Sequence, residues 1–425
     1  MRELNADVVV VGAGPAGVAA ACEAAERNVG VLLLDENPAP GGQIWRSGTK
    51  APPPAADAWF QRLAATAAVT KPGTGVVDAT GPHELFVQDA DGVSRVRANT
   101  TILATGAREL FVPFPGWTLP GVLGAGGIQA LAKTGWPVAG ERVVVAGSGP
   151  LLLAVAGYLT EAGAQVVALV EQAERRTLMA ALPTLAMRPA KLRQAIALGL
   201  SLRGVPKYYG SWPVRAEGEG NLERLTIRTP RGDRDVDCEL VGCGFGLVPE
   251  TRLARVLGAS CENGRVKVDG DQQTSVPRLY AAGELTGVGG VDVALAEGCV
   301  AGCAAAGDTV AARQRAELRD KELRFTAALD RAFVLRPEIA ALAEPDTIVC
   351  RCEDVTFSEV AGFDDARDAK LKTRCGMGPC QGRVCGPALR LIKGWSPDRI
   401  RPPLLPIPTV ALAEISAAST REVTP

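Results

Sequence analysis

The hydrophobic positions of the chain form short apolar runs, each followed by a glycine-rich turn and a stretch of small residues. Residues 6–11 (ADVVVV) predict a buried strand, the alanine-rich stretch after GAGPAG predicts a helix, and VGVLLLDE predicts a second buried strand. The same order of strand, helix and strand returns at residues 141–171, where ERVVVAGSGP leads into LLLAVAGYLTEAGA and QVVALVEQ. Two such β-α-β units predict two nucleotide-binding folds in series.

The rest of the pattern indicates how these folds are divided. TTILATGARE and SVPRLYAAGELTGVGG are further apolar strands that end in glycine turns, and a charged helical stretch begins at about residue 311. The proline-rich tail RPPLLPIPTVAL is expected to be extended. The predicted parts are a first nucleotide fold at 1–115 and 246–310, a second at 116–245, a helical linker at 311–345, a cysteine-rich domain at 346–400 and an extended tail at 401–425.

The first glycine loop has the G-x-G-x-x-G spacing between a strand and a helix. In this motif Gly12 allows the tight turn, Gly14 lets the backbone reach a pyrophosphate, and Gly17 lets helix and strand pack closely. Pro15 and Ala16 open the helix, whose N-terminus would face the phosphates. The spacing alone is a weak signal, since a glycine-rich turn can lack any ligand. Its full β-α-β context favours a dinucleotide site.

An acidic residue completes this motif at the end of the second strand. Asp35 follows Gly17 by 18 residues, the place where a carboxylate bonds a ribose hydroxyl, and Glu36 is the neighbouring alternative.

The second glycine loop is incomplete. Gly147 and Gly149 repeat the start of the motif, but Leu152 stands where the packing glycine belongs, and its side chain should push the helix away from the strand. Glu171, 19 residues after Leu152, could still bond a ribose. An NAD(H) site is one interpretation. A retained fold that binds another nucleotide, or none, is favoured because the packing glycine is missing.

Composition and charge exclude several classes of function. The 46 basic and 47 acidic residues nearly cancel, which gives no support for a nucleic-acid partner. The N-terminus has no signal-peptide pattern, and glycines and a proline interrupt the most apolar stretch, so we expect no transmembrane segment and a cytoplasmic location.

Five of the eleven cysteines crowd into the stretch from Cys350 to Cys385, which in a reducing compartment indicates a metal site. Four thiolates can hold a [2Fe-2S] cluster, and the glycines between them allow backbone amides to approach the sulfurs. Cys375, Cys380 and Cys385 are separated by equal gaps, so spacing cannot choose among them. A zinc site is the alternative, but C-x-C followed by a pair with a four-residue gap fits zinc spacing poorly.

Two resemblances extend this interpretation. VVVVGAGPAG, LLLDENPAPGGQI, ILATGARE and LYAAGELTGVGG together resemble the FAD-binding elements of two-dinucleotide-fold flavoprotein reductases of the glutathione and thioredoxin reductase type, over residues 1 to about 310. The resemblance implies that certain residues lie around FAD: Gly41, Gly42 and Gln43 near the flavin, Thr105 and Gly106 near the adenine side, and Gly283 and Glu284 at the ribityl and phosphate region.

The second resemblance concerns the cysteine-rich stretch. VCRCEDVTFSEV and TRCGMGPCQGRVCGP are similar to the bacterioferritin-associated-ferredoxin-like [2Fe-2S] domain. This similarity implies that the cluster ligands are Cys350, Cys352, Cys380 and Cys385, with Cys375 as a bystander. The expected fold class is therefore α/β, with two Rossmann-like dinucleotide-binding domains followed by this small iron-sulfur domain.

Other candidates have simpler explanations. The pairs Cys238 with Cys243 and Cys299 with Cys303 are expected to be small buried side chains rather than redox sites. His83, the single histidine, lies in a turn before a strand and is expected to be a surface residue, so we assign no catalytic residue.

Taken together, the two modules resemble the α subunit of heteromeric bacterial amine and imino-acid dehydrogenases, the group that includes opine oxidase, hydrogen cyanide synthase and D-hydroxyproline dehydrogenase. The resemblance implies a partner flavoprotein β subunit that oxidises the C–N bond, room for a small third subunit, and a downstream electron acceptor. This chain would carry FAD and the [2Fe-2S] cluster, and the degenerate loop could hold a second nucleotide. One alternative is a stand-alone NAD(P)H-dependent reductase, which would need a working second glycine loop. The other is a non-catalytic scaffold whose nucleotide sites are structural.

Overall fold

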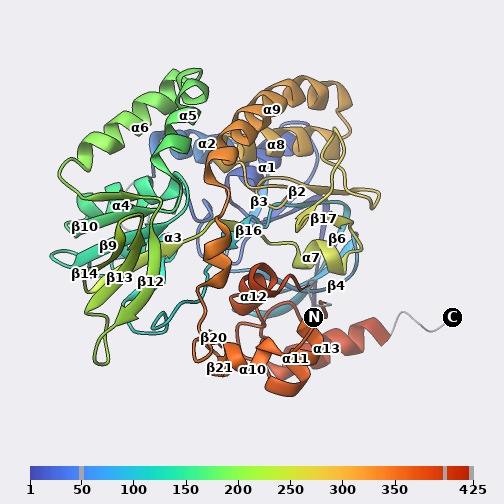
Figure 1. Ribbon diagram of the computed structural model, residues 1–425. Coiled ribbons are helices and arrows are strands. Elements are labelled where there is room, and N and C mark those ends of the chain that lie inside the picture. The colour runs from blue at the N-terminus through green and yellow to red at the C-terminus, as the bar shows by residue number, and fades with distance from the viewer. Residues whose placement is uncertain (47–51, 396–399, 421–425) are drawn as a thin grey trace. The chain divides into compact units, whose positions relative to one another are not determined.

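The computed structural model describes residues 1–46, 52–395 and 400–420, which fall into two compact units. Unit 1 comprises the described residues of Met1–Arg108, Pro249–Thr326 and Arg399–Pro425, and unit 2 those of Glu109–Val248 and Ala327–Asp398. Each unit contains one of the two glycine loops, and unit 2 also contains the cysteine-rich stretch (Figure 1).

A seven-stranded sheet forms the centre of unit 1. Its order is β3-β2-β1-β6-β5-β4, and β19 also pairs with β6. The strands β1, β2, β3, β6 and β19 are parallel to one another, whereas β5 is antiparallel to both of its neighbours, β4 and β6. The bounds are β1 Arg2–Val11, β2 Val31–Leu34, β3 Val69–Lys71, β4 Gly75–Gly81, β5 Glu84–Asp89, β6 Gly92–Leu103 and β19 Leu279–Ala281. The last four residues of β1 are all buried, as expected of a central parallel strand with both faces covered.

Two small-residue helices pack against each other on this sheet. A Cβ added to Gly298 would lie 2.2 Å from the carbonyl oxygen of Ala16, and one added to Gly302 would lie 2.4 Å from that of Ala20, so α1 and α8 approach as closely as their backbones allow. Figure 1 shows them side by side. The helices that lie wholly in unit 1 are α1 Pro15–Ala25, α2 Pro54–Ala64, α7 Arg252–Val256, α8 Gly290–Ala305 and α13 Thr409–Thr420, and β17 Cys261–Glu262 with β18 Arg265–Val266 forms a hairpin.

The C-terminal tail is not extended throughout, contrary to the prediction. Residues 409–420 form α13, in which Ala411 and Ile415 are buried one helical turn apart. They pack with Val77, Phe86 and Val93 of unit 1. This contact with an apolar face of the sheet stabilises the helix, which the proline-rich segment before it did not predict.

A five-stranded parallel sheet, ordered β11-β10-β9-β15-β8, forms the centre of unit 2. Four helices and an antiparallel sheet ordered β12-β13-β14 accompany it. The strands are β8 Val122–Gly124, β9 Arg142–Gly147, β10 Gln165–Glu171, β11 Lys207–Tyr209, β12 Trp212–Glu217, β13 Arg224–Thr229, β14 Gly232–Asp237 and β15 Leu240–Gly244. The helices are α3 Ala125–Lys133, α4 Leu151–Glu161, α5 Arg175–Ala186 and α6 Pro189–Ser201. The short strands β7 Ala107–Glu109 and β16 Leu247–Pro249 and the long helix α9 Thr309–Asp330 carry the chain from one unit to the other.

The cysteine-rich stretch forms a small module in unit 2. Its elements are η1 Arg331–Phe333, η2 Pro337–Ala341, β20 Ile348–Cys350, β21 Val355–Thr356, α10 Phe357–Ala361, α11 Ala366–Thr373 and α12 Cys385–Lys393. The indole of Trp117 donates to the carbonyl of Ile348 at 2.5 Å, and Arg215 pairs with Glu344 at 2.9 Å. These contacts attach the module to the rest of its unit.

Both predicted β-α-β units are present, as β1-α1-β2 and β9-α4-β10, so the prediction of two Rossmann-like folds is confirmed. Among the described residues, no helix combines the length and the apolar character that a bilayer crossing requires.

Candidate cofactor sites

The first glycine loop has the geometry that its spacing predicts. Gly12 adopts φ +104°, and a Cβ added to Gly17 would lie 1.7 Å from the carbonyl oxygen of Gly12, so helix and strand meet at a distance that only glycine permits. Helix α1 begins at Pro15, and no side chain caps it within the described part of the chain. Its N-terminal amides are therefore available to an anion.

Two other segments converge on this loop. The amide of Gly41 donates to the carbonyl of Ala13 at 2.7 Å, and a Cβ added to Gly42 would lie 3.1 Å from the Cα of Gly14. On the other side, a Cβ added to Gly283, whose φ is +84°, would lie 2.7 Å from the Cβ of Ala16. The folded chain thus gathers residues 12–17, 41–42 and 283–284 around the N-terminus of α1.

Of the two candidate acids after β2, Asp35 faces the loop. Asp35 is buried, and its carboxylate accepts from the amide of Ala13 at 2.5 Å and from the backbone and side-chain nitrogens of Asn37 at 2.7 Å each. Glu36 is exposed. Asn37 is a residue that the sequence pattern did not single out, and it orients the Asp35 carboxylate.

The other residues predicted for the first site differ in their surroundings. The hydroxyl of Thr105 donates to the carbonyl of Glu250 at 2.8 Å, and the amide of Glu250 donates to the carbonyl of Gly106 at 2.9 Å. Gln43 is exposed. Thr105 and Gly106 therefore lie at the end of β6, paired with the strand-to-helix turn before α7.

Glu284 and Glu297 provide carboxyl groups beside the loop. The Glu297 carboxylate accepts from the amide of Gly283 at 2.7 Å and from the hydroxyl of Thr286 at 2.7 Å, and burial raises its pKa to about 7. Burial also raises the pKa of Glu284, and no hydrogen-bond donor to its carboxylate is found within residues 1–46, 52–395 and 400–420. Glu284 is half-buried, so its carboxylate can accept from a hydroxyl group of a ligand or from solvent.

The second glycine loop resembles the first but differs where the packing glycine is absent. Leu152 is buried in the hydrophobic cluster with Val145 and Leu169. A leucine side chain is accommodated here, whereas at Gly17 not even a Cβ would fit. The expected displacement of α4 from its strand stays a prediction.

Glu171 bonds the second loop itself. Its carboxylate accepts from the amides of Gly149 and Ala173 at 2.8 Å each, and burial raises its pKa to about 7. Gly147 approaches the carbonyl oxygen of Gly244 so closely that an added Cβ would lie 1.8 Å from it. The loop is retained as a structural turn of unit 2.

In the cysteine module, three thiols meet in the interior. The sulfur atoms of Cys350, Cys375 and Cys385 all lie within 4.8 Å of one another, and all three residues are buried. Cys350 ends β20, Cys375 follows α11, and Cys385 begins α12. The trio includes Cys375, which sequence similarity had set aside and which spacing alone could not exclude.

The other two cysteines lie toward the solvent. Cys352 is exposed and Cys380 half-buried, and both the backbone amide and the thiol of Cys380 are within hydrogen-bonding reach of the Cys352 thiol. Glycines make this packing possible, because a Cβ added to Gly378 would lie 2.2 Å from the Cβ of Cys352, and the amide of Gly376 donates to the Cys350 sulfur at 3.4 Å. All five thiols therefore line one module, as a metal cluster requires.

The pairs Cys238 with Cys243 and Cys299 with Cys303 are buried as predicted. Burial raises the pKa of Cys238, Cys299 and Cys303 to about 12 and that of Cys243 further, so all four thiols stay protonated at neutral pH.

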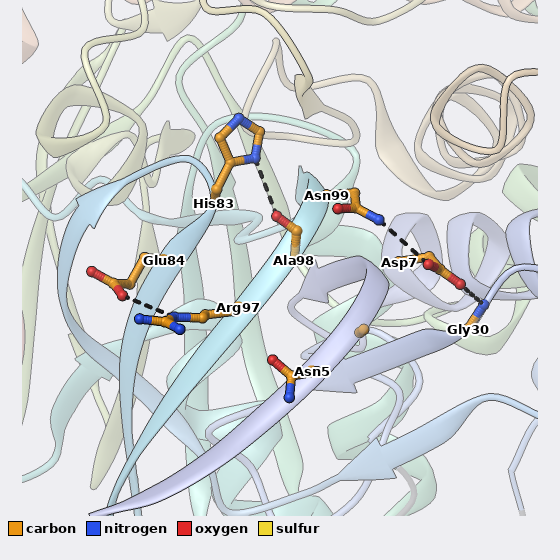
Figure 2. A pocket seen from close by; sticks show the side chains of 9 residues that line it. Asn5, Asp7, Gly30, His83, Glu84, Arg97, Ala98 and Asn99 are labelled. Carbon is orange, nitrogen blue, oxygen red and sulfur yellow. Dashed lines mark hydrogen bonds and ion pairs between the residues drawn. The ribbon is translucent and has the colours of Figure 1, made fainter.

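His83 borders a cavity of about 710 Å³ in unit 1 (Figure 2). Its Nδ1 lies 3.1 Å from the carbonyl oxygen of Ala98, and Figure 2 shows Glu84 paired with Arg97 on the same wall. The other lining residues are Asn5, Ala6, Asp7, Gly30 and Asn99. Asn5 and Asp7 precede the buried part of β1, whereas Gly12 follows it, so this cavity lies at the opposite strand ends from the first glycine loop.

Comparisons with known proteins agree with this architecture. Residues 6–298 match the model of the pyridine nucleotide-disulphide oxidoreductase family. The chain is 32% identical to hydrogen cyanide synthase subunit HcnB of Pseudomonas aeruginosa over 94% of its own length and 93% of that protein. It is 33% identical to an opine oxidase subunit of Rhizobium meliloti, with 96% and 98% covered. A solved structure, L-proline dehydrogenase from P. horikoshii, has a similar fold, with a TM-score of 0.67, 18% identity, and coverage of 97% of this chain and 80% of that one.

Proposed function

The chain belongs to the pyridine nucleotide-disulphide oxidoreductase family, and from this premise we propose that it is the FAD- and [2Fe-2S]-carrying electron-transfer subunit of a heteromeric dehydrogenase. The complex would oxidise the C–N bond of an amino or imino acid of the D-hydroxyproline, opine or glycine class, on a partner flavoprotein subunit. A flavin accepts an electron pair and releases single electrons, and a [2Fe-2S] centre carries one electron at a time.

One observation carries this proposal: a single chain combines an uncapped glycine loop in unit 1 with a five-cysteine module in unit 2. The relatives that match over more than nine-tenths of their length are named as subunits of hydrogen cyanide synthase and opine oxidase, which supports a partner chain. Leu152 in the second loop argues against the stand-alone NAD(P)H reductase.

The residues of the first site would divide the work of holding FAD. The amides at the start of α1 would bind the pyrophosphate, Asp35 would accept from a ribose hydroxyl, and Glu284 would accept from a ribityl hydroxyl. Cys350, Cys352, Cys380 and Cys385 remain our proposed cluster ligands, which fit the tendency of iron-sulfur clusters to bind four thiolates near backbone amides.

We expect the purified chain to contain FAD and iron and to oxidise no amino or imino acid by itself. Of the residues proposed around FAD, none is a histidine, so no imidazole is available there as a base. Dye reduction with proline, hydroxyproline, glycine and opines should stay at the no-enzyme rate for this chain and should rise only when the partner protein is added. Substrate-dependent dye reduction by the chain alone would contradict the division of labour, and anaerobic bleaching of its flavin by NADH would favour the reductase.

Replacing Glu284 by glutamine should weaken FAD binding and stabilise the apoprotein. The folded-state pKa of Glu284 is raised by burial, so the native state loses stability relative to the unfolded chain as pH rises above the unfolded pKa. Glu284→Gln removes this loss, and its apoprotein should melt about 2–4 °C higher than the wild-type apoprotein at pH 8, an effect of about 1 kcal/mol.

At pH 4, where the wild-type carboxyl is neutral, the two apoproteins should melt together. Glu317→Gln, at an exposed position of α9 in unit 1, is the matched control and should change neither the melting temperature nor FAD affinity. Unchanged FAD affinity in Glu284→Gln would remove Glu284 from the proposed site.

A further inference from the structure

The segment that leads from α9 into the cysteine module lies on the second glycine loop. The hydroxyl of Ser148, between the two loop glycines, donates to the carbonyl of Phe333 at 3.3 Å. We call residues 333–336 the covering segment. Both the loop and this segment belong to unit 2.

Gln172 fastens the covering segment to the end of β10. It is fully buried, and its amide nitrogen donates to the Ser148 hydroxyl at 3.0 Å and to the carbonyl of Val334 at 3.2 Å. Its amide oxygen accepts from the backbone nitrogen of Arg336 at 3.1 Å. The buried amide of Gln172 uses both its donor and its acceptor in this contact. The covering segment is therefore held in a defined position.

Arg336, the last residue of the covering segment, makes further contacts near the end of β10. Its guanidinium pairs with Glu174 at 3.0 Å, three residues after Glu171, and lies 5.2 Å from the centre of the Trp212 ring. The end of β10 is where the adenosine of a dinucleotide would lie in a fold of this kind. The ion pair with Glu174 holds Arg336 beside this end of β10.

The two glycine loops differ in exposure at their first glycine. Gly12 is partly exposed and the corresponding Gly147 is buried, whereas Gly14 and the corresponding Gly149 are both partly exposed. A pyrophosphate must come within hydrogen-bonding distance of such a loop, so the covering segment competes for the space that the ligand needs. The Leu152 side chain lies in the hydrophobic core, so it does not itself cover the loop.

We propose that the covering segment and Gln172 determine donor specificity by excluding NADH and NADPH from the second fold. The fold serves instead as the docking site for the chain's own segment. This goes beyond the proposed function, because it assigns a role to the second fold that holds whether or not a partner protein feeds the first.

The test is NADH binding to the full-length chain, measured by titration calorimetry and by NADH fluorescence. The wild-type protein should show no binding at concentrations up to about 1 mM, since a Kd above that corresponds to less than about 4 kcal/mol of binding free energy. Gln172→Ala combined with Arg336→Ala should release the segment and raise affinity at least tenfold, and hydrogen exchange of residues 333–336 should accelerate. Arg336→Ala alone, which changes a partly exposed side chain, should give a smaller change in the same direction and guards against failure of the double variant to fold.

Arg224→Ala is the matched control, because it removes an ion pair of unit 2, with Asp237 between β13 and β14, that does not involve the cysteine module. It should leave NADH binding undetectable. NADH binding by the wild-type chain would overturn the proposal, as would a folded, released variant with accelerated exchange that still binds no NADH. Either result leaves the proposed function standing, because FAD and iron content are measured separately.

Discussion

Valine in place of Gly14 should abolish FAD retention while leaving the apoprotein folded. A Cβ at this position would meet only the Cα of Gly42, at 3.9 Å, which is an ordinary contact, and Gly14 has a negative φ that any residue can adopt. The space beside Gly14 is therefore not needed by the protein itself. The branched side chain would stand where we propose that the pyrophosphate approaches the backbone.

We expect FAD occupancy of Gly14→Val to fall to less than about one tenth per chain. Loss of two charge-assisted hydrogen bonds to the pyrophosphate, about 3 kcal/mol, would lower affinity roughly a hundredfold. Occupancy is measured from flavin absorbance after gel filtration. Stability must be compared between apoproteins, because bound FAD itself stabilises the folded state.

Gly17→Ala provides the contrasting control within the same loop. An added Cβ would lie 1.7 Å from the carbonyl oxygen of Gly12, so this variant should lose stability even without FAD. Normal FAD occupancy in Gly14→Val would refute the assignment of the first loop. A wild-type melting temperature for the Gly17→Ala apoprotein would refute the close packing of α1.

The second large effect is expected from the cysteine module. If Cys350, Cys352, Cys380 and Cys385 hold the cluster, Cys375→Ala should keep about two irons and two labile sulfides per chain, with an unchanged paramagnetic resonance spectrum in the reduced state. Cys385→Ala removes a ligand and should lose most of the cluster.

The position of Cys375 affects what is expected of Cys385→Ala, so a double variant is needed as well. Cys375 lies within 4.8 Å of both Cys350 and Cys385, so its thiolate can replace a missing ligand with little movement. Any cluster that remains in Cys385→Ala should therefore have a shifted spectrum. Cys375→Ala combined with Cys385→Ala should contain no cluster.

Cys261→Ala, a half-buried cysteine of unit 1, controls for the loss of a thiol as such and should leave iron content and spectrum unchanged. An unchanged spectrum in Cys385→Ala together with an altered one in Cys375→Ala would mean that Cys375 is the ligand and Cys385 the bystander.

Structural features that depend on residues close together in the sequence could be predicted from the sequence. The order of strand, glycine turn and helix defines both β-α-β units, because the periodicity of apolar residues and the need for glycine at a tight turn are local properties. The missing packing glycine at Leu152 is also evident from the local spacing, and the structure shows this leucine buried. The burial of Cys238 and Cys243 followed from their apolar surroundings.

Other features depend on segments that meet only in the folded chain. Arg336 lies 164 residues after Gln172, and no local sequence pattern predicts the hydrogen bond between them. The gap from Cys375 to Cys380 equals the gap from Cys380 to Cys385. Only the turn after α11 brings Cys375 beside Cys350 and Cys385. The helix α13 forms because Ala411 and Ile415 find an apolar surface on the sheet of unit 1. The sequence by itself thus determined the two nucleotide folds and the cysteine module, whereas tertiary packing decided which loop is covered and which thiols meet, since such contacts depend on where distant segments come together.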